Sequence, residues 1–67
     1  MEIEKIAIYV EELLEYTKGI KGNADNDITQ GQLIGIAEAL TILRETCDEE
    51  QRKAIGLEED PDNLIFN

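Results

Sequence analysis

The sequence predicts an all-α protein built around an antiparallel helical hairpin, and three observations support this prediction. Apolar residues recur at spacings of three and four, the period of a helix that buries one face. Turn-forming residues gather between two such series, in the segment GIKGNADND. No segment shows a convincing strand pattern. Two helices joined by a short loop are expected to lie antiparallel.

We expect the first helix over residues 2–18. Its core-facing series is Ile3, Ile6, Val10, Leu13, Thr17 and Ile20, with Ala7 and Leu14 on one flank and Tyr9 and Tyr16 on the other. The carboxylates of this helix fall on the opposite face. Gly19 is expected to end the helix in a left-handed conformation. The predicted loop spans residues 19–27, and Asp27 or Thr29 is expected to cap the next helix.

We expect the second helix over residues 28–55. Its main apolar stripe is Leu33, Ile36, Ala37, Leu40, Leu43 and Cys47, with Ala54 and Ile55 returning to the same face. A smaller stripe beside it consists of Gly31, Gly35, Ala39 and Ile42. Each glycine costs about 1 kcal/mol relative to alanine inside a helix. Small residues at a four-residue spacing allow another backbone to approach closely. The smaller stripe is therefore predicted to be a close-packed interface.

Residues 1–56 are predicted to form the hairpin, and residues 57–67 an acidic C-terminal tail with an apolar end. Gly56 is expected to end the second helix. The segment LEEDPD that follows carries four carboxylates and the only proline. The closing Leu64, Ile65 and Phe66 are expected to dock on the hairpin itself, although the sequence leaves docking on a partner open.

The size of the chain predicts a homodimer. A chain of 67 residues is one domain at most, and a domain this short buries only about 60% of its unfolded surface. Small domains usually need a disulfide, a metal or a partner subunit. Cys47 is the only cysteine and histidine is absent, so an internal disulfide is impossible and a zinc site is disfavoured. We therefore expect two hairpins to form a four-helix bundle with Gly31, Gly35, Ala39 and Ile42 at the interface.

The charge of the chain bears on its partners. The formal charge is −10, from 16 acidic and 6 basic residues. This disfavours direct binding to nucleic acid, which needs clustered cations, and to anionic membranes. It favours a basic protein partner, contacted by Glu58, Glu59, Asp60 and Asp62, although such a charge also simply keeps a protein in solution. An acidic N-terminal region, short apolar runs and one unpaired cysteine predict a cytoplasmic protein.

One carboxylate pattern resembles that of an enzyme family. Glu11, Glu12 and Glu15 form EELLE, and Glu45 and Asp48 lie in ETCD. This resembles the EExxE…ExxD arrangement of the MazG-like all-α nucleoside triphosphate pyrophosphohydrolases. The resemblance implies that these five carboxylates hold Mg²⁺, which positions a triphosphate for hydrolysis. Oxygen ligands suit such hard cations.

The function favoured by the sequence is non-enzymatic and requires no cofactor. With no histidine to activate it, Cys47 is expected to be an inert core residue. A tiny, acidic, helical, dimeric chain is similar in type to accessory proteins of bacteriophages and mobile elements in Gram-positive bacteria. We therefore expect an interaction protein that binds and inhibits or regulates a host protein. The alternatives are the Mg²⁺-dependent pyrophosphohydrolase and a purely structural assembly module.

Overall fold

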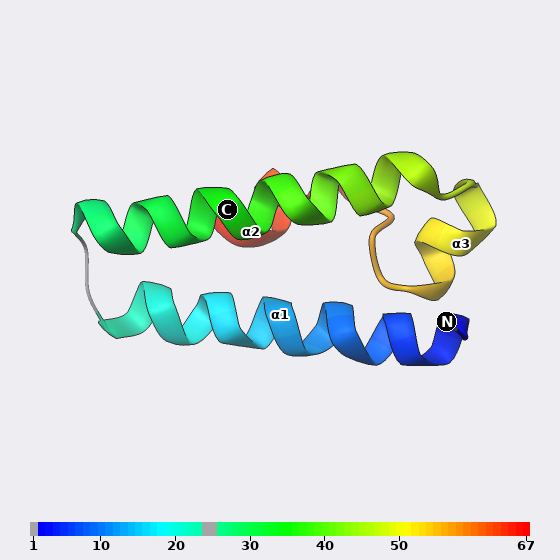
Figure 1. Ribbon diagram of the computed structural model, residues 1–67, viewed down its shortest axis with the longest axis horizontal. Coiled ribbons are helices and arrows are strands. Elements are labelled where there is room, and N and C mark those ends of the chain that lie inside the picture. Colours follow the sequence, from blue (N-terminus) through cyan, green and yellow to red (C-terminus); the bar gives the residue numbers. More distant parts are fainter. Residues whose placement is uncertain (1, 24–25) are drawn as a thin grey trace.

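The computed structural model describes residues 2–23 and 26–67 and confirms the all-α helical hairpin (Figure 1). Its helices are α1 (Ile3–Asn23), α2 (Asp27–Thr46), α3 (Glu49–Ala54) and α4 (Pro61–Phe66). The long helices α1 and α2 run antiparallel and pack together, and the two short helices follow α2. The molecule measures 35 × 18 × 18 Å.

Helix α1 is longer than predicted. It continues through Gly19, which was expected to end it, and reaches Asn23. Ile20, in the part of the helix beyond Gly19, packs against the core. Residues 24 and 25 of the predicted loop lie outside the described part of the chain. Asn26, rather than Asp27 or Thr29, caps α2: its Oδ1 accepts the backbone N–H of Thr29 at 2.9 Å and the Thr29 hydroxyl at 3.1 Å.

The prediction of one helix over residues 28–55 is wrong beyond Thr46. The backbone becomes extended at Cys47, and Asp48 begins α3. The Asp48 carboxylate accepts the backbone N–H of Gln51 at 2.8 Å, and the Gln51 side chain accepts the backbone N–H of Asp48 at 2.9 Å. This reciprocal capping box stabilises a helix start at this position. The chain therefore turns a corner instead of continuing along the axis of α2.

Glycine and proline direct the chain after α3. Gly56 has a φ of 83°, a left-handed conformation that favours glycine and ends the helix. Leu57, the next residue, is completely buried. Asp60 caps α4, and Pro61 occupies the first turn, where its missing N–H costs nothing. The segment expected to be an acidic tail is thus a short loop and a helix.

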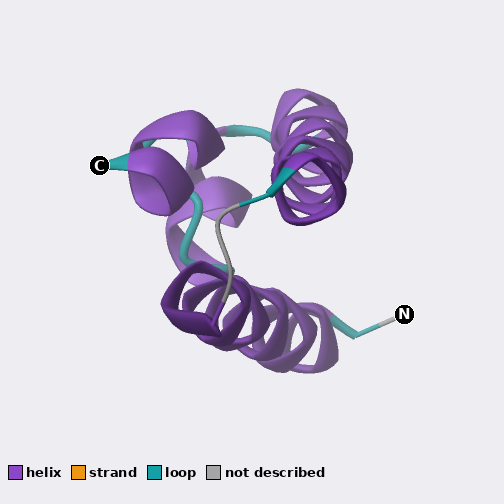
Figure 2. Cartoon of the chain, turned by 90° about the vertical axis from the view of Figure 1, so that its left-hand side faces the viewer, coloured by secondary structure: helices purple, strands orange, loops and turns teal. Residues whose placement is uncertain are grey.

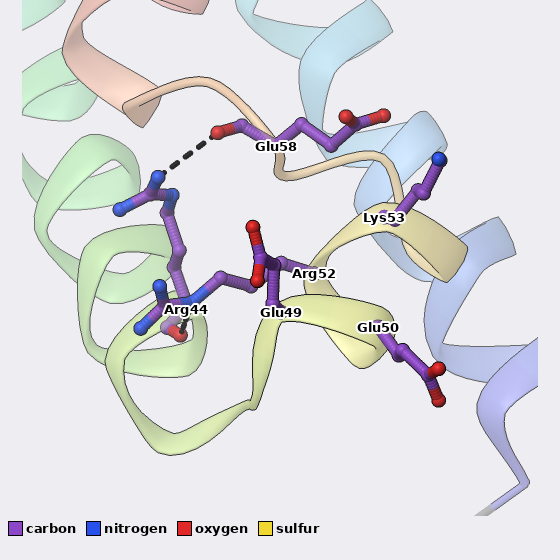
Figure 3. Close-up of a pocket in the computed structure, with 6 residues that line it drawn as sticks. All are labelled: Arg44, Glu49, Glu50, Arg52, Lys53 and Glu58. Carbon is purple, nitrogen blue, oxygen red and sulfur yellow. Dashed lines mark hydrogen bonds between the residues drawn. The ribbon is translucent and has the colours of Figure 1, made fainter.

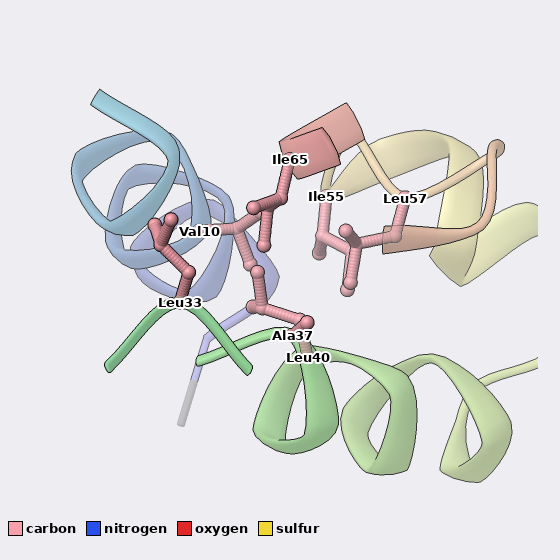
Figure 4. Packing of buried hydrophobic residues seen from close by; sticks show 7 residues of the cluster. All are labelled: Val10, Leu33, Ala37, Leu40, Ile55, Leu57 and Ile65. Carbon is pink, nitrogen blue, oxygen red and sulfur yellow. The ribbon is translucent and has the colours of Figure 1, made fainter. Parts of the chain in front are cut away.

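All four helices or the loops beside them contribute to the core (Figure 4). The fully buried apolar residues are Val10, Leu33, Ala37, Leu40, Ile55, Leu57 and Ile65. Four of these lie on the stripes predicted for the two long helices, and three come from the last thirteen residues. Most of the other apolar residues of the predicted stripes are partly buried and pack against this core. Helix α4 contacts both α1 and α2, and α3 contacts α1. The C-terminal segment therefore docks on its own hairpin.

The short helices lie on one side of the hairpin. Figure 2 shows α3 and α4 together beside the α1–α2 pair, with no described segment on the opposite side. One face between the long helices is thus covered by the chain itself, and the other is left to solvent.

The docking of α4 predicts a large difference between two isoleucine substitutions. Ile65 is 2% exposed, whereas Ile34, on α2, is 48% exposed. Ile65→Ala is expected to lower the free energy of unfolding by about 2–5 kcal/mol, because it leaves a cavity in the core. Ile34→Ala is the matched control and is expected to cost less than about 1 kcal/mol. Urea unfolding followed by circular dichroism measures both values. Equal effects would show that α4 is not packed on the hairpin.

Candidate interaction surfaces

An apolar groove lies between α1 and α2 on the face that the short helices leave uncovered. Its volume is about 370 Å³. Its lining residues are Tyr9, Leu13, Tyr16, Gly31, Gln32, Gly35, Ile36 and Ala39. None of them is charged, although 33% of the chain is charged. The groove is therefore the uncharged surface of a highly acidic protein.

The two walls of the groove differ in size. Residues three and four positions apart form a row along a helix. On α1 such a row places Tyr9 and Tyr16 beside the groove, and these side chains are 60% and 57% exposed. On α2 the corresponding row consists of Gly31, Gly35 and Ala39. A Cβ atom added at either glycine would meet no neighbouring atom within 4 Å, so the α2 wall is open space within one chain.

The predicted interface residues largely lie together. Gly31, Gly35 and Ala39 line the groove, whereas Ile42 is 64% exposed and does not line it. Helical periodicity predicts Tyr9 and Tyr16 on the flank of the first helix, without assigning them to an interface. Helical periodicity gives this flank, but the side on which α3 and α4 dock determines that it remains exposed.

A second feature, for which the sequence carries no signal, is a set of three cations that bind backbone carbonyl groups. Lys21 Nζ donates to the Ile65 carbonyl at 2.6 Å. Arg44 Nε and Nη2 donate to the carbonyls of Leu57 and Glu58, both at 2.9 Å. These bonds attach the C-terminal segment to α1 and α2.

Arg52 completes the attachment at the corner after α2. Its Nε donates to the Arg44 carbonyl at 2.7 Å, and its own carbonyl accepts the Leu57 N–H at 2.8 Å. Carbonyls near helix ends lack partners within the helix. The Arg44 carbonyl also accepts the Cys47 N–H at 3.2 Å, so it has two donors at the corner. No spacing rule in the sequence reveals such long-range bonds.

The two arginines line a charged hollow of about 450 Å³ (Figure 3). Its lining residues are Arg44, Glu49, Glu50, Arg52, Lys53 and Glu58. Three cations and three carboxylates balance in formal charge, and both guanidinium groups already bind carbonyl oxygens. The residues that line the hollow therefore hold the corner of the fold together, and they present no net charge to a ligand.

The carboxylates are distributed differently from the cations. Every acidic residue for which the structure describes exposure is exposed. Among the described residues, one ion pair is present, between Lys18 Nζ and Glu15 Oε1 at 3.1 Å. The predicted partner-binding residues Glu58, Glu59, Asp60 and Asp62 lie in the loop before α4 and in its first turn. Asp60 also has a structural role, because its Oδ1 accepts the Asp62 N–H at 2.9 Å.

The carboxylates named by the pyrophosphohydrolase resemblance do not form a metal site in the single chain. Glu11, Glu12 and Glu15 are exposed on α1, Glu45 is exposed near the end of α2, and the Asp48 carboxylate caps α3. Residues 2–23 and 26–67 contain no group of three acidic or cysteine side chains arranged to hold a metal ion. The break at Cys47 separates Asp48 from the helix that carries Glu45.

Two observations concern the chain as a whole. None of the helices described in residues 2–23 and 26–67 is both long and apolar enough to cross a membrane. Comparisons with models of known protein families, with curated proteins and with solved structures found no match. Function has to be inferred from the surfaces described above.

The hydrogen bonds from Arg44 to the carbonyls of Leu57 and Glu58 predict that replacing Arg44 lowers the free energy of unfolding more than replacing Lys53. Arg44→Met keeps the aliphatic length but leaves the carbonyl of buried Leu57 without its donor. It is expected to lower the free energy of unfolding by about 1–3 kcal/mol. Lys53→Met, at an exposed position of the same hollow, is the control with the same charge change. Thermal unfolding of both variants tests this, and equal stability would contradict the structural role of Arg44.

Proposed function

We propose that this protein acts by binding another protein, and that its acidic surface recognises a basic surface on the partner. The observation that carries the proposal is the contrast between the two kinds of charge. Three of the 6 basic residues bind backbone carbonyls of the chain itself. The carboxylates whose exposure the structure describes are, in contrast, all exposed. The negative charge is therefore available to a partner rather than neutralised within the fold.

The acidic loop before α4 is the part of this surface that we assign to partner binding. Its backbone is held in place by Arg44, by buried Leu57 and by buried Pro61. Glu58, Glu59, Asp60 and Asp62 are consequently presented on an ordered segment. Ordering a binding segment beforehand reduces the entropy lost on association. Opposite charges also accelerate the encounter of two proteins.

We extend the proposal to the type of protein and to its assembly. A small acidic chain that occupies a basic site would inhibit or regulate its target, as a phage or mobile-element accessory protein does to a host protein. Its free thiol, Cys47, fits the reducing cytoplasm. The open apolar groove supports the homodimeric four-helix bundle, because exposed tyrosines and isoleucines become buried when two such faces meet.

The acidic surface predicts binding that is sensitive to salt and to four neutralising substitutions. Glu58→Gln, Glu59→Gln, Asp60→Asn and Asp62→Asn together remove four charges, and asparagine at position 60 preserves a helix cap. Salt screens the attraction between exposed charges, over a distance that falls from about 8–10 Å at physiological ionic strength to about 3 Å at 1 M. Affinity capture from a bacterial lysate, with mass spectrometry, is expected to lose the partner in the variant and at high salt.

The matched control removes four charges elsewhere. Glu2, Glu4, Glu11 and Glu12, all exposed, are replaced with glutamine. This variant is expected to retain the partner. If the same protein is captured by both variants and at high salt, the acidic loop is not the binding surface.

The dimer predicts that Gly35→Leu disrupts association without unfolding the chain. A Cβ atom added at position 35 meets no atom of its own chain within 4 Å, and leucine favours a helix over glycine by up to about 1 kcal/mol. The substitution is therefore expected to act mainly on the contact with a second copy. Sedimentation equilibrium is expected to show monomers for Gly35→Leu and dimers for Gly19→Leu, a similarly open glycine on α1 outside the groove. A dimeric Gly35→Leu protein would place the interface elsewhere.

A further inference from the structure

The groove is asymmetric in a way that specifies how a second copy fits. One wall carries the large, exposed side chains of Tyr9 and Tyr16, and the other carries Gly31, Gly35 and Ala39. A two-fold interface requires that each residue of one copy meets its counterpart in the other reciprocally. The arrangement that satisfies both walls places the large wall of each copy against the small wall of the other.

We infer that a second copy of the chain occupies the groove with the two-fold axis parallel to α1 and α2, so that the tyrosines of each copy pack on the glycine wall of the other. This inference rests on the proposed homodimer and specifies its interface. In this arrangement α1 of each copy faces α2 of the other, and all neighbouring helices are antiparallel, as in up-down-up-down bundles. The alternative, with an axis perpendicular to the helices, would stack α2 on α2 and tyrosine on tyrosine.

The antiparallel hairpin determines which residues meet. Tyr16 and Gly31 both lie in the half of their helix nearer the connection from α1 to α2, and Tyr9 and Ala39 both lie in the other half. Rotation about an axis parallel to the helices leaves these levels unchanged. Tyr16 therefore meets the glycine at position 31 of the second copy, and Tyr9 meets its residues 35 and 39.

Charge favours a second copy as the occupant, and the two tyrosines supply part of the area that an interface needs. A basic partner would be recognised by carboxylates, yet no charged side chain lines the groove. Two copies that each carry a charge of −10 repel one another least where their uncharged faces meet. The exposed fractions of the two tyrosines correspond to about 200 Å² of accessible surface. That is roughly a quarter of the ~800 Å² per partner in a standard interface.

Further apolar surface lies at the edge of the same face. Ile28 and Ile42 are 76% and 64% exposed, and they lie on either side of the glycine wall along α2. The distance between them along the helix is about 21 Å at 1.5 Å per residue. The face is therefore long enough for the bundle to extend over most of α2.

The direct test is an isotope-filtered NOE experiment on dimers mixed from labelled and unlabelled wild-type chains. We expect NOEs between copies from the tyrosine ring protons to Gly31, Gly35 and Ala39. Contacts between the α2 helices of the two copies, without tyrosine contacts, would overturn the inferred axis while leaving a dimer. Monomers at all concentrations in sedimentation equilibrium would overturn the dimer itself. The proposal that the acidic surface binds a basic partner is separate, and the charge variants test it.

Substitutions supply a second test of the same interface. Tyr9→Ala with Tyr16→Ala is expected to raise the dimer dissociation constant at least about thirtyfold, because buried aromatic anchors dominate interface energies. Ile8→Ala, at a position 58% exposed outside the groove, is the control and is expected to change it less than about threefold. Equal effects would contradict the interface. A further outcome would also contradict it. If the wild-type chain is monomeric and a synthetic leucine–lysine helical peptide shifts the NMR resonances of the groove residues, the groove binds a helical partner and not a second copy.

Discussion

The fold depends on the docking of its last eleven residues into the hairpin. Two helices that pack side by side leave apolar surface on both sides of their contact, and a chain of 67 residues has little else with which to cover it. Leu57 and Ile65 fill one of these two sides. Backbone carbonyls that bind Lys21 and Arg44 fix the segment there. Because the short helices cover only this side, the groove on the other side is a direct consequence of the same docking.

The attachment of the C-terminal segment also explains the electrostatic character of the surface. A cation that binds a carbonyl oxygen holds two parts of the backbone together without neutralising a carboxylate. Arg44 and Arg52 act in this way at the corner after α2. Their charges are partly withdrawn from solvent, whereas the carboxylates around them remain exposed. The bonds from these cations to carbonyl oxygens therefore stabilise the fold and also leave the negative charge of the carboxylates on the surface.

The sequence predicts the two long helices and their buried faces well, because helical periodicity reports which side chains share a face. Val10, Leu33 and Leu40 lie on the predicted stripes and are buried. The ends of the helices are predicted less well. Glycine permits a helix end but does not require one, so Gly19 remains helical when the next turn can pack. The break at Cys47, in contrast, has a readable signal, since Asp48 and Gln51 have the spacing of a capping box.

Part of the candidate site can be predicted from local spacing in the sequence, and part depends on contacts between distant residues. The small residues at positions 31, 35 and 39 follow from their spacing alone, and they do line one groove. The role of Tyr9 and Tyr16 depends on which side of the hairpin α4 covers, and that depends on contacts between distant parts of the chain. The cation–carbonyl bonds are beyond sequence reasoning for the same reason, because backbone acceptors carry no sequence signature.

The two proposed surfaces reinforce one another. The groove is uncharged and the acidic loop lies on a different part of the fold, so a second copy and a basic partner do not compete for the same residues. The proposed dimer would carry twice the charge of −10 per chain and would present two acidic loops on one body. A target with two basic sites would then bind the second loop at a high effective concentration, which can strengthen binding by about 10²–10⁴ without any new contact. For a chain this small, the proposed assembly would thus increase both the stability of the fold and the strength with which its surface binds.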